Sequence, residues 1–411
     1  MMKRIIALLF ILLTIGANSQ NTISPYSIFG PGEIQNKGFG ATQSLGGAGI
    51  GYRNGGSLNN INPSSYTSVD SSRIIVEFGI ENKLYNLNSK SISQTGYTGN
   101  LNYVAMGFRY TKWMSGSFGL VPFSSIGYSI SKENFIEGTN SKYTSVYNGS
   151  GGINQFYFGH AVKLFKNLSL GLNISYMFGS LIQKEDIEAT NYVPQVQINR
   201  QDFLKSFYFD YGLQYSVRTN KFDYTFGLVY SNKQKLNSTH ILSVYDESSA
   251  LIRYEEYDTD YLTLPTIFGV GLGINKQGRY NLLLDYNFQK WSGIEYPIQY
   301  DEFVNSHSFS LGLDFRPWEY SVANQFYKNW EYQLGFNYKS SYLKFGNEIV
   351  RGGSISLGAG IPLPGNISKI NLGIEIGSNG TVTNRLIQEK YILLNLGLSM
   401  NEIAFIKRKF N

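Results

Sequence analysis

Segments of about ten residues along this chain alternate between an apolar parity and a small or polar parity. In residues 391–400 the apolar parity is Ile392, Leu394, Leu396, Leu398 and Met400. The other parity there ends in Asn395, Gly397 and Ser399. Because successive side chains of a strand point to opposite faces, each such strand has one apolar and one polar environment. Repeated between turn residues, this pattern is typical of a transmembrane β-barrel with lipid outside and a wet or plugged lumen inside.

The alternation predicts an all-β fold, an antiparallel transmembrane β-barrel of about fourteen strands, the even number that closed bacterial barrels have. The predicted strands contain residues 74–80, 104–110, 117–130, 154–165, 167–179, 207–217, 224–230, 268–274, 282–288, 309–315, 332–338, 355–361, 370–376 and 392–400. Short turns follow the second, fourth, sixth and eighth strands, whereas long polar connections follow the odd ones. The longest predicted loops are 131–153, 180–201 and 234–262. This asymmetry predicts an outer-membrane barrel with both termini in the periplasm.

The N-terminus has the pattern of a signal peptide. Lys3 and Arg4 precede an apolar run over residues 5–15, and Ala17 and Ser19 have the spacing that a signal peptidase recognises. We therefore expect cleavage before Gln20, since the run is short for a membrane helix, which is the alternative. The predicted organisation is a signal peptide (1–19), an N-terminal plug (20–72) and a barrel (73–411).

Composition agrees with a barrel and narrows the chemistry. Charged residues make up 16% of the chain, while Gly (44) and Tyr (32) are abundant. Low charge suits strands with one face in lipid, and tyrosine suits the aromatic girdles at the membrane interfaces. The absence of cysteine excludes disulfides, thiolate metal sites and lipid attachment through cysteine. The basic C-terminal end, Lys407 to Lys409, is typical of a solvated terminus and indicates no nucleic-acid site.

Residues 20–72 do not alternate and are rich in Gly, Asn, Ser and Pro. They are either a disordered leader or a folded plug. Their clearest motif is Gly46, Gly47, Ala48 and Gly49, followed by Asn62 and Pro63. The glycines permit positive φ and close backbone approach, and Asn-Pro favours a turn, which suits a compact segment inside a lumen. A phosphate-binding loop is excluded, because Asn54 stands where a third glycine is needed and no βαβ unit surrounds it.

These motifs, in this order before the first strand, resemble those of the FadL-type outer-membrane transporters of long-chain fatty acids and other hydrophobic compounds. Further matches lie at residues 118–124 and 264–266. Residues 285–291 and 405–409 resemble the Bacteroidetes-type branch, which includes PorV-like relatives. One departure is Ser64, where the family usually has alanine. The resemblance implies an outer-membrane barrel whose N-terminal plug blocks the aqueous path.

Pro122 lies within the third predicted strand. Proline cannot donate to a ladder, so a closed wall must bulge or kink near Gly119 and Pro122. FadL-type proteins have a kinked third strand that opens the wall sideways, which implies a lateral gate here. By parity His160 faces lipid on the fourth strand, at a height comparable with Pro122, and would be tolerated beside such an opening or under a protein partner. The alternative is a local bulge that resets the parity and turns His160 inward.

The lumen-facing parity also carries charge, including Glu77, Arg109, Asp210 and Asp285. Such groups commonly pair with one another or with a plug. The alternative is a clamp for the headgroup of a ligand, for which Arg109 is the best candidate to bind a carboxylate. The three histidines have no metal-ligand spacing and no nucleophile elbow occurs, so the sequence predicts neither enzyme, cofactor nor metal site.

Two functions therefore remain. The first is passive uptake of a hydrophobic small molecule, fatty-acid-like, with lateral release into outer-membrane lipid. The second is a barrel that transports nothing and serves as an accessory subunit, bound to other outer-membrane proteins of a type IX secretion or barrel-assembly machine. A structural barrel whose plug never moves is a third possibility, and the sequence does not give the ligand, the oligomeric state or the plug's mobility.

Overall fold

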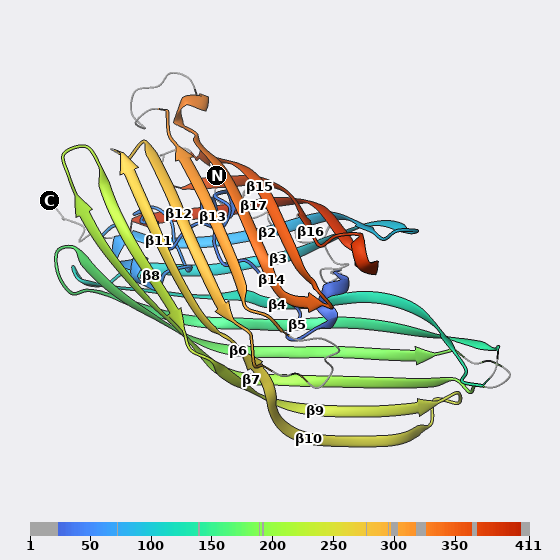
Figure 1. Cartoon of the computed structure of the whole chain (residues 1–411). Coiled ribbons are helices and arrows are strands. Elements are labelled where there is room, and N and C mark those ends of the chain that lie inside the picture. The colour runs from blue at the N-terminus through green and yellow to red at the C-terminus, as the bar shows by residue number, and fades with distance from the viewer. Residues whose placement is uncertain are drawn as a thin grey trace.

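The computed structural model describes residues 24–403 except 72, 139, 189, 191–192, 277, 295, 297–302, 318–325 and 364–367. The chain forms a closed antiparallel barrel of fourteen strands, which confirms the predicted fold (Figure 1). The strands are β2 (Arg73–Asn88), β3 (Ser93–Arg109), β4 (Met114–Phe135), β5 (Lys142–Lys163), β6 (Leu168–Ile187), β7 (Val196–Arg218), β8 (Asp223–Ser231), β9 (Gln234–Asp246), β10 (Leu251–Leu264), β11 (Thr266–Lys276), β12 (Tyr280–Lys290), β13 (Ser306–Phe315), β14 (Glu331–Phe345), β15 (Glu348–Pro362), β16 (Lys369–Asn379) and β17 (Gln388–Ile403). The pairs β8/β9 and β10/β11 each form one interrupted barrel strand, and pairing of β17 with β2 closes the wall.

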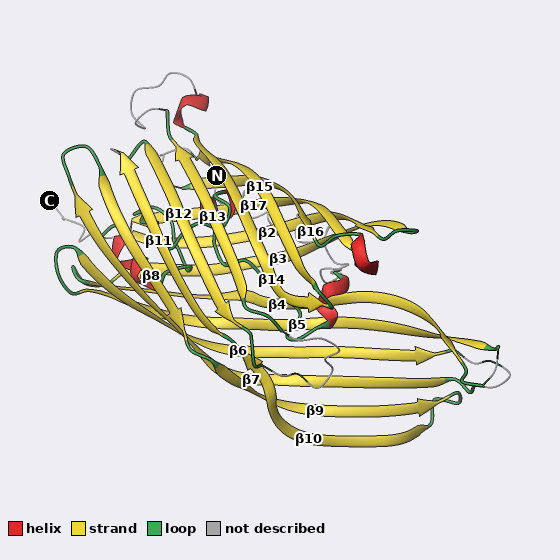
Figure 2. Cartoon of the chain, viewed as in Figure 1, coloured by secondary structure: helices red, strands yellow, loops and turns green. Residues whose placement is uncertain are grey.

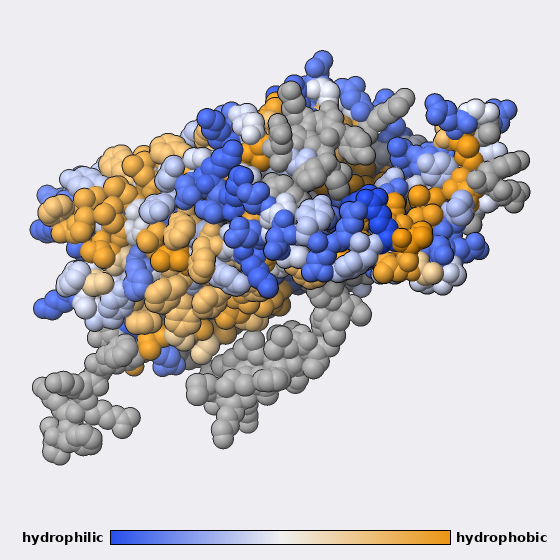
Figure 3. Space-filling view, turned by 90° about the horizontal axis from the view of Figure 1, so that it is seen from below, coloured by the Kyte–Doolittle hydropathy of each residue, from blue (hydrophilic) through white to orange (hydrophobic). Residues whose placement is uncertain are grey.

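The apolar parity of each strand points outward, as the alternation predicts. Leu284, Leu313, Leu334, Leu357 and Ile374, from five strands, are all exposed on the outer surface. Figure 3 shows such side chains gathered in a broad apolar patch over one part of the molecule. A band of this kind is what a barrel presents to lipid. Among the described residues no helix is both long and apolar enough to cross a membrane.

The two ends of the barrel differ. We call the end with the connections β3–β4, β5–β6 and β7–β8 the turn end, and the opposite end the loop end. Arg73 at the start of β2 pairs with Ile403 at the end of β17, so both lie at the turn end.

The predicted long loops are wrong in detail, because most of their residues continue the strands. Strands β4, β5, β6, β7, β9 and β10 run on beyond the loop-end limits of their neighbours and form a one-sided projection (Figure 1). We call this projection the loop-end sheet. Its residues are polar at many outward positions, such as Gln197, Asn199 and Gln201 of β7. The outward face meets water rather than lipid there, so the lipid parity that reveals a membrane strand is missing.

A line of irregularities separates the barrel from the loop-end sheet. The β4–β5 register shifts between Pro122 and Ser124. Gly151 and Gly179 on the next two strands have φ of 104° and 150°, a region that favours glycine. The line continues at residues 232–233 between β8 and β9, and at Pro265 between β10 and β11. Bulges and prolines of this kind let strands bend without ending the sheet.

Residues 24–71, which we call the N-terminal segment, lie inside the barrel. Their elements are η1 (Pro25–Ile28), β1 (Glu33–Ile34), α2 (Ala41–Ser44) and η2 (Pro63–Ser68). Figure 2 shows these short helices within the ring of strands; η3 (Phe326–Asn329) and η4 (Thr383–Arg385) belong to connections of the wall.

The N-terminal segment begins near the loop end. There the Ser24 backbone N–H donates to the Gly127 carbonyl oxygen of β4 at 2.8 Å. The segment thus crosses the lumen to Arg73 at the turn end, and the placement of both termini in the periplasm stays a prediction. The expected signal peptide and the basic C-terminal end lie outside the described residues.

Candidate functional site

The N-terminal segment fits against wall positions that have no side chain. These lumen-facing glycines, the glycine belt, come from most of the strands: Gly107, Gly159, Gly171, Gly212, Gly227, Gly271, Gly273, Gly312, Gly335, Gly358 and Gly373. A Cβ added at Gly227 would lie 2.1 Å from the Ile50 carbonyl oxygen, and one at Gly335 2.1 Å from the Gly46 nitrogen. Backbone cannot yield as a flexible side chain can, so the belt fixes where the segment sits.

Hydrogen bonds hold the same part of the segment to the wall. Asp285 on β12 accepts from the backbone N–H groups of Gly49 at 2.6 Å and Ile50 at 2.8 Å through one carboxylate oxygen. Gln214 on β7 donates to the Ile50 carbonyl oxygen at 2.8 Å. These side chains satisfy backbone groups that the segment, lacking a ladder, would leave unpaired in a buried place.

The predicted plug motif is at the centre of this contact. Gly46 and Gly47 have φ of 65° and 74°, so both require glycine. Ala48 is fully buried. Asn62 caps η2 by accepting from the Ser64 N–H at 3.1 Å, and its amide donates to the Leu213 carbonyl oxygen of β7 at 3.1 Å. Pro63 occupies the first position of η2, where its missing N–H costs nothing.

The wall departs from regular pairing at the kinked strand. β3 pairs with β4 only over residues 104–109 and 115–120, with Gly119 opposite Ala105 inside this paired stretch. From there toward the loop end, β1 of the N-terminal segment pairs with Ser124 and Ser125 of β4. Pro122 thus stands where β4 leaves its wall neighbour β3 for the inner segment.

A cavity of about 250 Å³ lies beside this kink. Val121, Pro122 and Phe123 line one side of it, and residues 32–39 of the N-terminal segment line another. The opposite wall is mainly polar and contributes side chains of β12, β13 and β14: Asn287, Gln289, Ser306, Ser308, Ser310, Asn337 and Lys339. The cavity therefore offers an apolar surface at the kink and hydrogen-bonding groups across from it.

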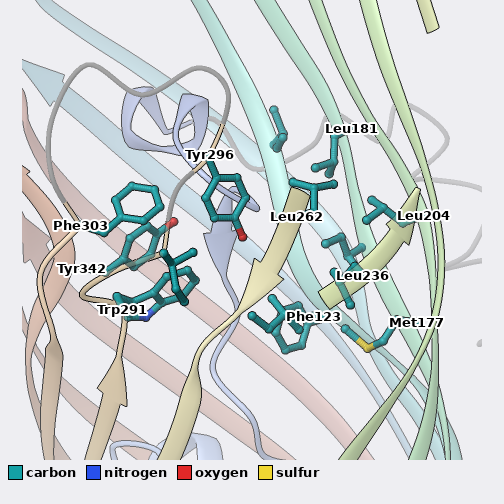
Figure 4. Packing of buried hydrophobic residues seen from close by; sticks show 14 of the residues in the cluster. Phe123, Met177, Leu181, Leu204, Leu236, Leu262, Trp291, Tyr296, Phe303 and Tyr342 are labelled. Carbon is teal, nitrogen blue, oxygen red and sulfur yellow. The ribbon is translucent and has the colours of Figure 1, made fainter. Parts of the chain in front are cut away.

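Apolar side chains fill the lumen toward the loop end (Figure 4). Trp291 stacks on Tyr342 with ring centroids 4.1 Å apart, and Phe303 meets Tyr342 edge-on at 5.2 Å. Phe123 extends this cluster to the kinked strand. The alternating pattern does not reveal this cluster, because two of these aromatic residues, Trp291 and Phe303, lie in the connection between β12 and β13, outside any alternating segment.

His160 faces outward as predicted, yet its expected height is wrong. It pairs with Gly116 near the turn end, whereas Pro122 pairs with Asn154. Six positions separate these levels, about 20 Å along a strand. His160 instead contacts Tyr110, whose hydroxyl lies 2.6 Å from its Nδ1. This partner, rather than a wall opening, satisfies the imidazole.

Arg109 lies at the turn between β3 and β4, outside the cavity. Its guanidinium donates to the Thr111 carbonyl oxygen at 3.2 Å and to that of Lys112. A basic group that does line the cavity is Lys37 of the N-terminal segment, paired with Asp210 at 2.9 Å. The predicted headgroup role of Arg109 is therefore not supported by its position.

Several inward charges contact the N-terminal segment, as one of the two alternatives expects. Glu77 accepts from the Leu58 N–H at 3.2 Å and Asp210 pairs with Lys37. A second group lies between wall strands, where Lys83 pairs with Glu389 at 2.5 Å. Among the described residues no cluster of His, Cys, Asp and Glu has the arrangement of a metal site.

A fourteen-strand barrel with an inner N-terminal segment and a third strand that leaves its neighbour has the FadL-type fold. Solved structures agree: the toluene transporter TbuX of Ralstonia pickettii (13% identity, TM-score 0.62), the toluene transporter TodX of Pseudomonas putida (15%, 0.60) and the CymD monoaromatic hydrocarbon channel (14%, 0.60). They cover 89%, 91% and 91% of this chain and 98%, 100% and 99% of their own, in that order. The family whose sequence model matches is BamG, over residues 1–411, so the chain belongs to the BamG family. No curated protein matches it.

Proposed function

We propose that this protein is an outer-membrane barrel for passive uptake of hydrophobic small molecules, with release sideways through the wall at Pro122. The observation that carries the proposal is that the cavity reaches the kink, where Val121, Pro122 and Phe123 line it and β3–β4 pairing has ended. The proteins of similar fold are toluene transporters and a monoaromatic hydrocarbon channel, which supports an apolar ligand.

The physical basis is partition of apolar surface out of water. Burial is favourable by about 25 cal/mol per Å², and lipid outside the wall is a further apolar environment. The glycine belt supports a sideways path, because it holds the N-terminal segment across the direct route to the turn end. In this scheme the turn end is periplasmic, the segment is the plug, and the ligand never passes it.

The experiment compares two proline variants in liposomes loaded with a fluorescent reporter of toluene and oleate. Pro122→Val restores a donor at the kink and is expected to slow uptake about tenfold or more. Pro265→Val alters a break on the far side of the loop-end sheet and serves as the matched control, expected to have uptake near that of the unaltered protein. Unchanged uptake in Pro122→Val, with both variants folded, would exclude the lateral path.

A second candidate function is an accessory subunit of an outer-membrane protein machine. The loop-end sheet favours it, since a conduit for small molecules needs no strands that project so far beyond the barrel. The packed apolar cluster at the loop end of the lumen and the whole-chain match to the BamG family also support it.

Native mass spectrometry of the protein taken from its own outer membrane in mild detergent separates the two candidates. A single barrel carrying one apolar small molecule supports uptake. A defined complex with other proteins, with an empty lumen, supports the accessory subunit and contradicts uptake as the main role.

A further inference from the structure

The outermost strand of the loop-end sheet has a free edge. β10 pairs antiparallel with β9, and within the described residues no strand pairs with the other side of Leu251–Asp258. In an antiparallel ladder every second residue directs its N–H and C=O away from its partner. About four residues of this stretch thus present unpaired backbone groups, a template for another strand.

Both faces of β10 are also uncovered. Leu251, Ile252, Tyr254 and Tyr257 are exposed by 54%, 62%, 52% and 50%, and Tyr254 and Tyr257 lie on opposite faces of the strand. Outward leucines of the barrel have lipid to cover them, whereas this strand lies beyond the apolar band. Large exposed apolar side chains beside an open edge mark an interaction surface.

The charge of this strand is opposite to that of the chain. Residues 246–260 contain six acidic side chains and one basic side chain, a net charge of −5, in a protein whose net charge is +6. Several acidic groups have exposed partners, such as Asp260 with Lys235 at 2.8 Å and Glu255 with Arg253 at 2.6 Å. Exposed ion pairs of this kind contribute little free energy, so the carboxylates remain available to a stronger cationic partner.

We propose that the edge of β10 binds an extended, lysine- or arginine-rich strand of a partner protein, by strand addition. The backbone groups would supply the ladder, the tyrosines and Ile252 would cover apolar side chains of the incoming strand, and the carboxylates would select for positive charge. This inference names the surface and the partner chemistry of the second candidate function, and it rests on that function.

The same charges exclude the simplest other occupant. Charged residues on an edge commonly prevent pairing with a second copy, and two β10 strands would place carboxylates against carboxylates. Two β10 edges therefore repel each other, whereas a basic strand is attracted. Repulsion of the wrong partner and attraction of the right one together give specificity. The other edge of the loop-end sheet, on β4, differs because the N-terminal segment is bonded to it at Gly127.

The first test uses the full-length protein in detergent and an eight-residue peptide of alternating lysine and valine. We expect binding that protects the amides of residues 251–258 from hydrogen exchange. Two peptides serve as controls, one with glutamate in place of lysine and one with proline in place of the central valines. Equal binding of the proline peptide, or binding without protection of β10, would overturn strand addition.

Charge reversal tests the same surface from the protein side. The variant Glu255→Lys/Glu256→Lys is expected to weaken peptide binding about tenfold or more, because two attractive groups become repulsive. Glu133→Lys/Glu137→Lys, on the exposed β4–β5 hairpin, is the matched control and is expected to bind as the unaltered protein does. Equal weakening in both variants would contradict a site on β10.

The last step separates this inference from the function on which it rests. A photoreactive amino acid replaces Tyr254 in cells of the native host, with Tyr97, exposed by 75% on β3, as control. Cross-linking through position 254 alone, to a basic extended segment of another protein, supports the inference, and cross-linking to a second copy overturns it. A complex seen by native mass spectrometry without this cross-link would leave the accessory function standing and refute the surface. The absence of any complex would refute both.

Discussion

Replacing Asp285 tests whether the wall holds the N-terminal segment by its backbone. One carboxylate oxygen accepts from the N–H groups of Gly49 and Ile50 at 2.6 and 2.8 Å, and Asp285 is only 5% exposed. In Asp285→Ala both N–H groups lose their acceptor in a buried place. In Asp285→Asn the amide oxygen can take the same position. Both variants lack the charge of the carboxylate. The difference between them in the free energy of unseating the segment therefore reports the two hydrogen bonds alone.

The magnitude follows from the cost of buried unpaired donors. Each costs about 1–3 kcal/mol, so Asp285→Ala should favour the unseated segment by about 2–6 kcal/mol relative to Asp285→Asn. Since 1.4 kcal/mol is a factor of ten, even the lower limit corresponds to roughly a thirtyfold larger unseated population.

Limited trypsin digestion measures this population, because cleavage after Lys37 and Arg53 requires the segment to leave the wall. When reclosing is faster than cleavage, the cleavage rate follows the open population. Asp223→Ala, which removes an exposed aspartate at the β7–β8 turn, is the matched control and should be cleaved as slowly as the unaltered protein. Equal cleavage rates in Asp285→Ala and Asp285→Asn, with intact barrels, would refute the role of the two hydrogen bonds.

Three further perturbations have defined outcomes. Gly227→Ala should destabilise the seated segment by about 1–3 kcal/mol or more through overlap with its backbone, whereas Gly353→Ala, whose nearest neighbour would be 3.5 Å away, should not; trypsin digestion compares them. Burial raises the pKa of Tyr26 from 10 to about 12. Its neutral phenol therefore stabilises the seated state below pH 10, and this contribution is lost between pH 10 and 12. The same pH dependence of the cleavage rate in a Tyr26→Phe variant would contradict this. Lys83→Met should cost about 3–5 kcal/mol in chemical unfolding by leaving Glu389 buried and unpaired, and adding Glu389→Gln should recover much of it; no recovery would show that the pair is not coupled.

The strands inside the apolar band could be predicted because every second residue faces lipid and is therefore apolar. All fourteen barrel strands were found in this way, and residues 168–178 of β6 show the alternation most clearly. The loop-end sheet was missed for the same physical reason. Outward residues such as Gln197 and Asn199 of β7 face water, and their polarity is that of a loop.

The site could be predicted in kind but not in geometry. The glycines at 46, 47 and 49 indicated close packing, and the wall glycines were present in the small parity of most strands, yet only the fold shows that they face one another. The height of His160 depends on how the strands are staggered, and alternation fixes the face of a residue but not its level. The inward position of Asp285 was evident, whereas its bonding partners are about 235 residues away in sequence.

The two parts of the N-terminal segment, residues 24–39 and residues 40–71, are held to the wall differently. This difference limits where the molecule can change shape. Residues 40–71 meet the glycine belt through backbone, and release there would break buried hydrogen bonds to Asp285 and Gln214. Residues 24–39 are held mainly by side chains, including the Lys37–Asp210 pair, and by the two-residue strand β1. The cavity is lined by both parts of the segment, by residues 32–39 and by Gly46, Gly47, Asn60 and Ile61. Because residues 24–39 are the more weakly held of the two, we expect a ligand in the cavity to move them first. Because β1 pairs with β4, and β4 continues into the loop-end sheet, a partner bound to that sheet would act on the same residues.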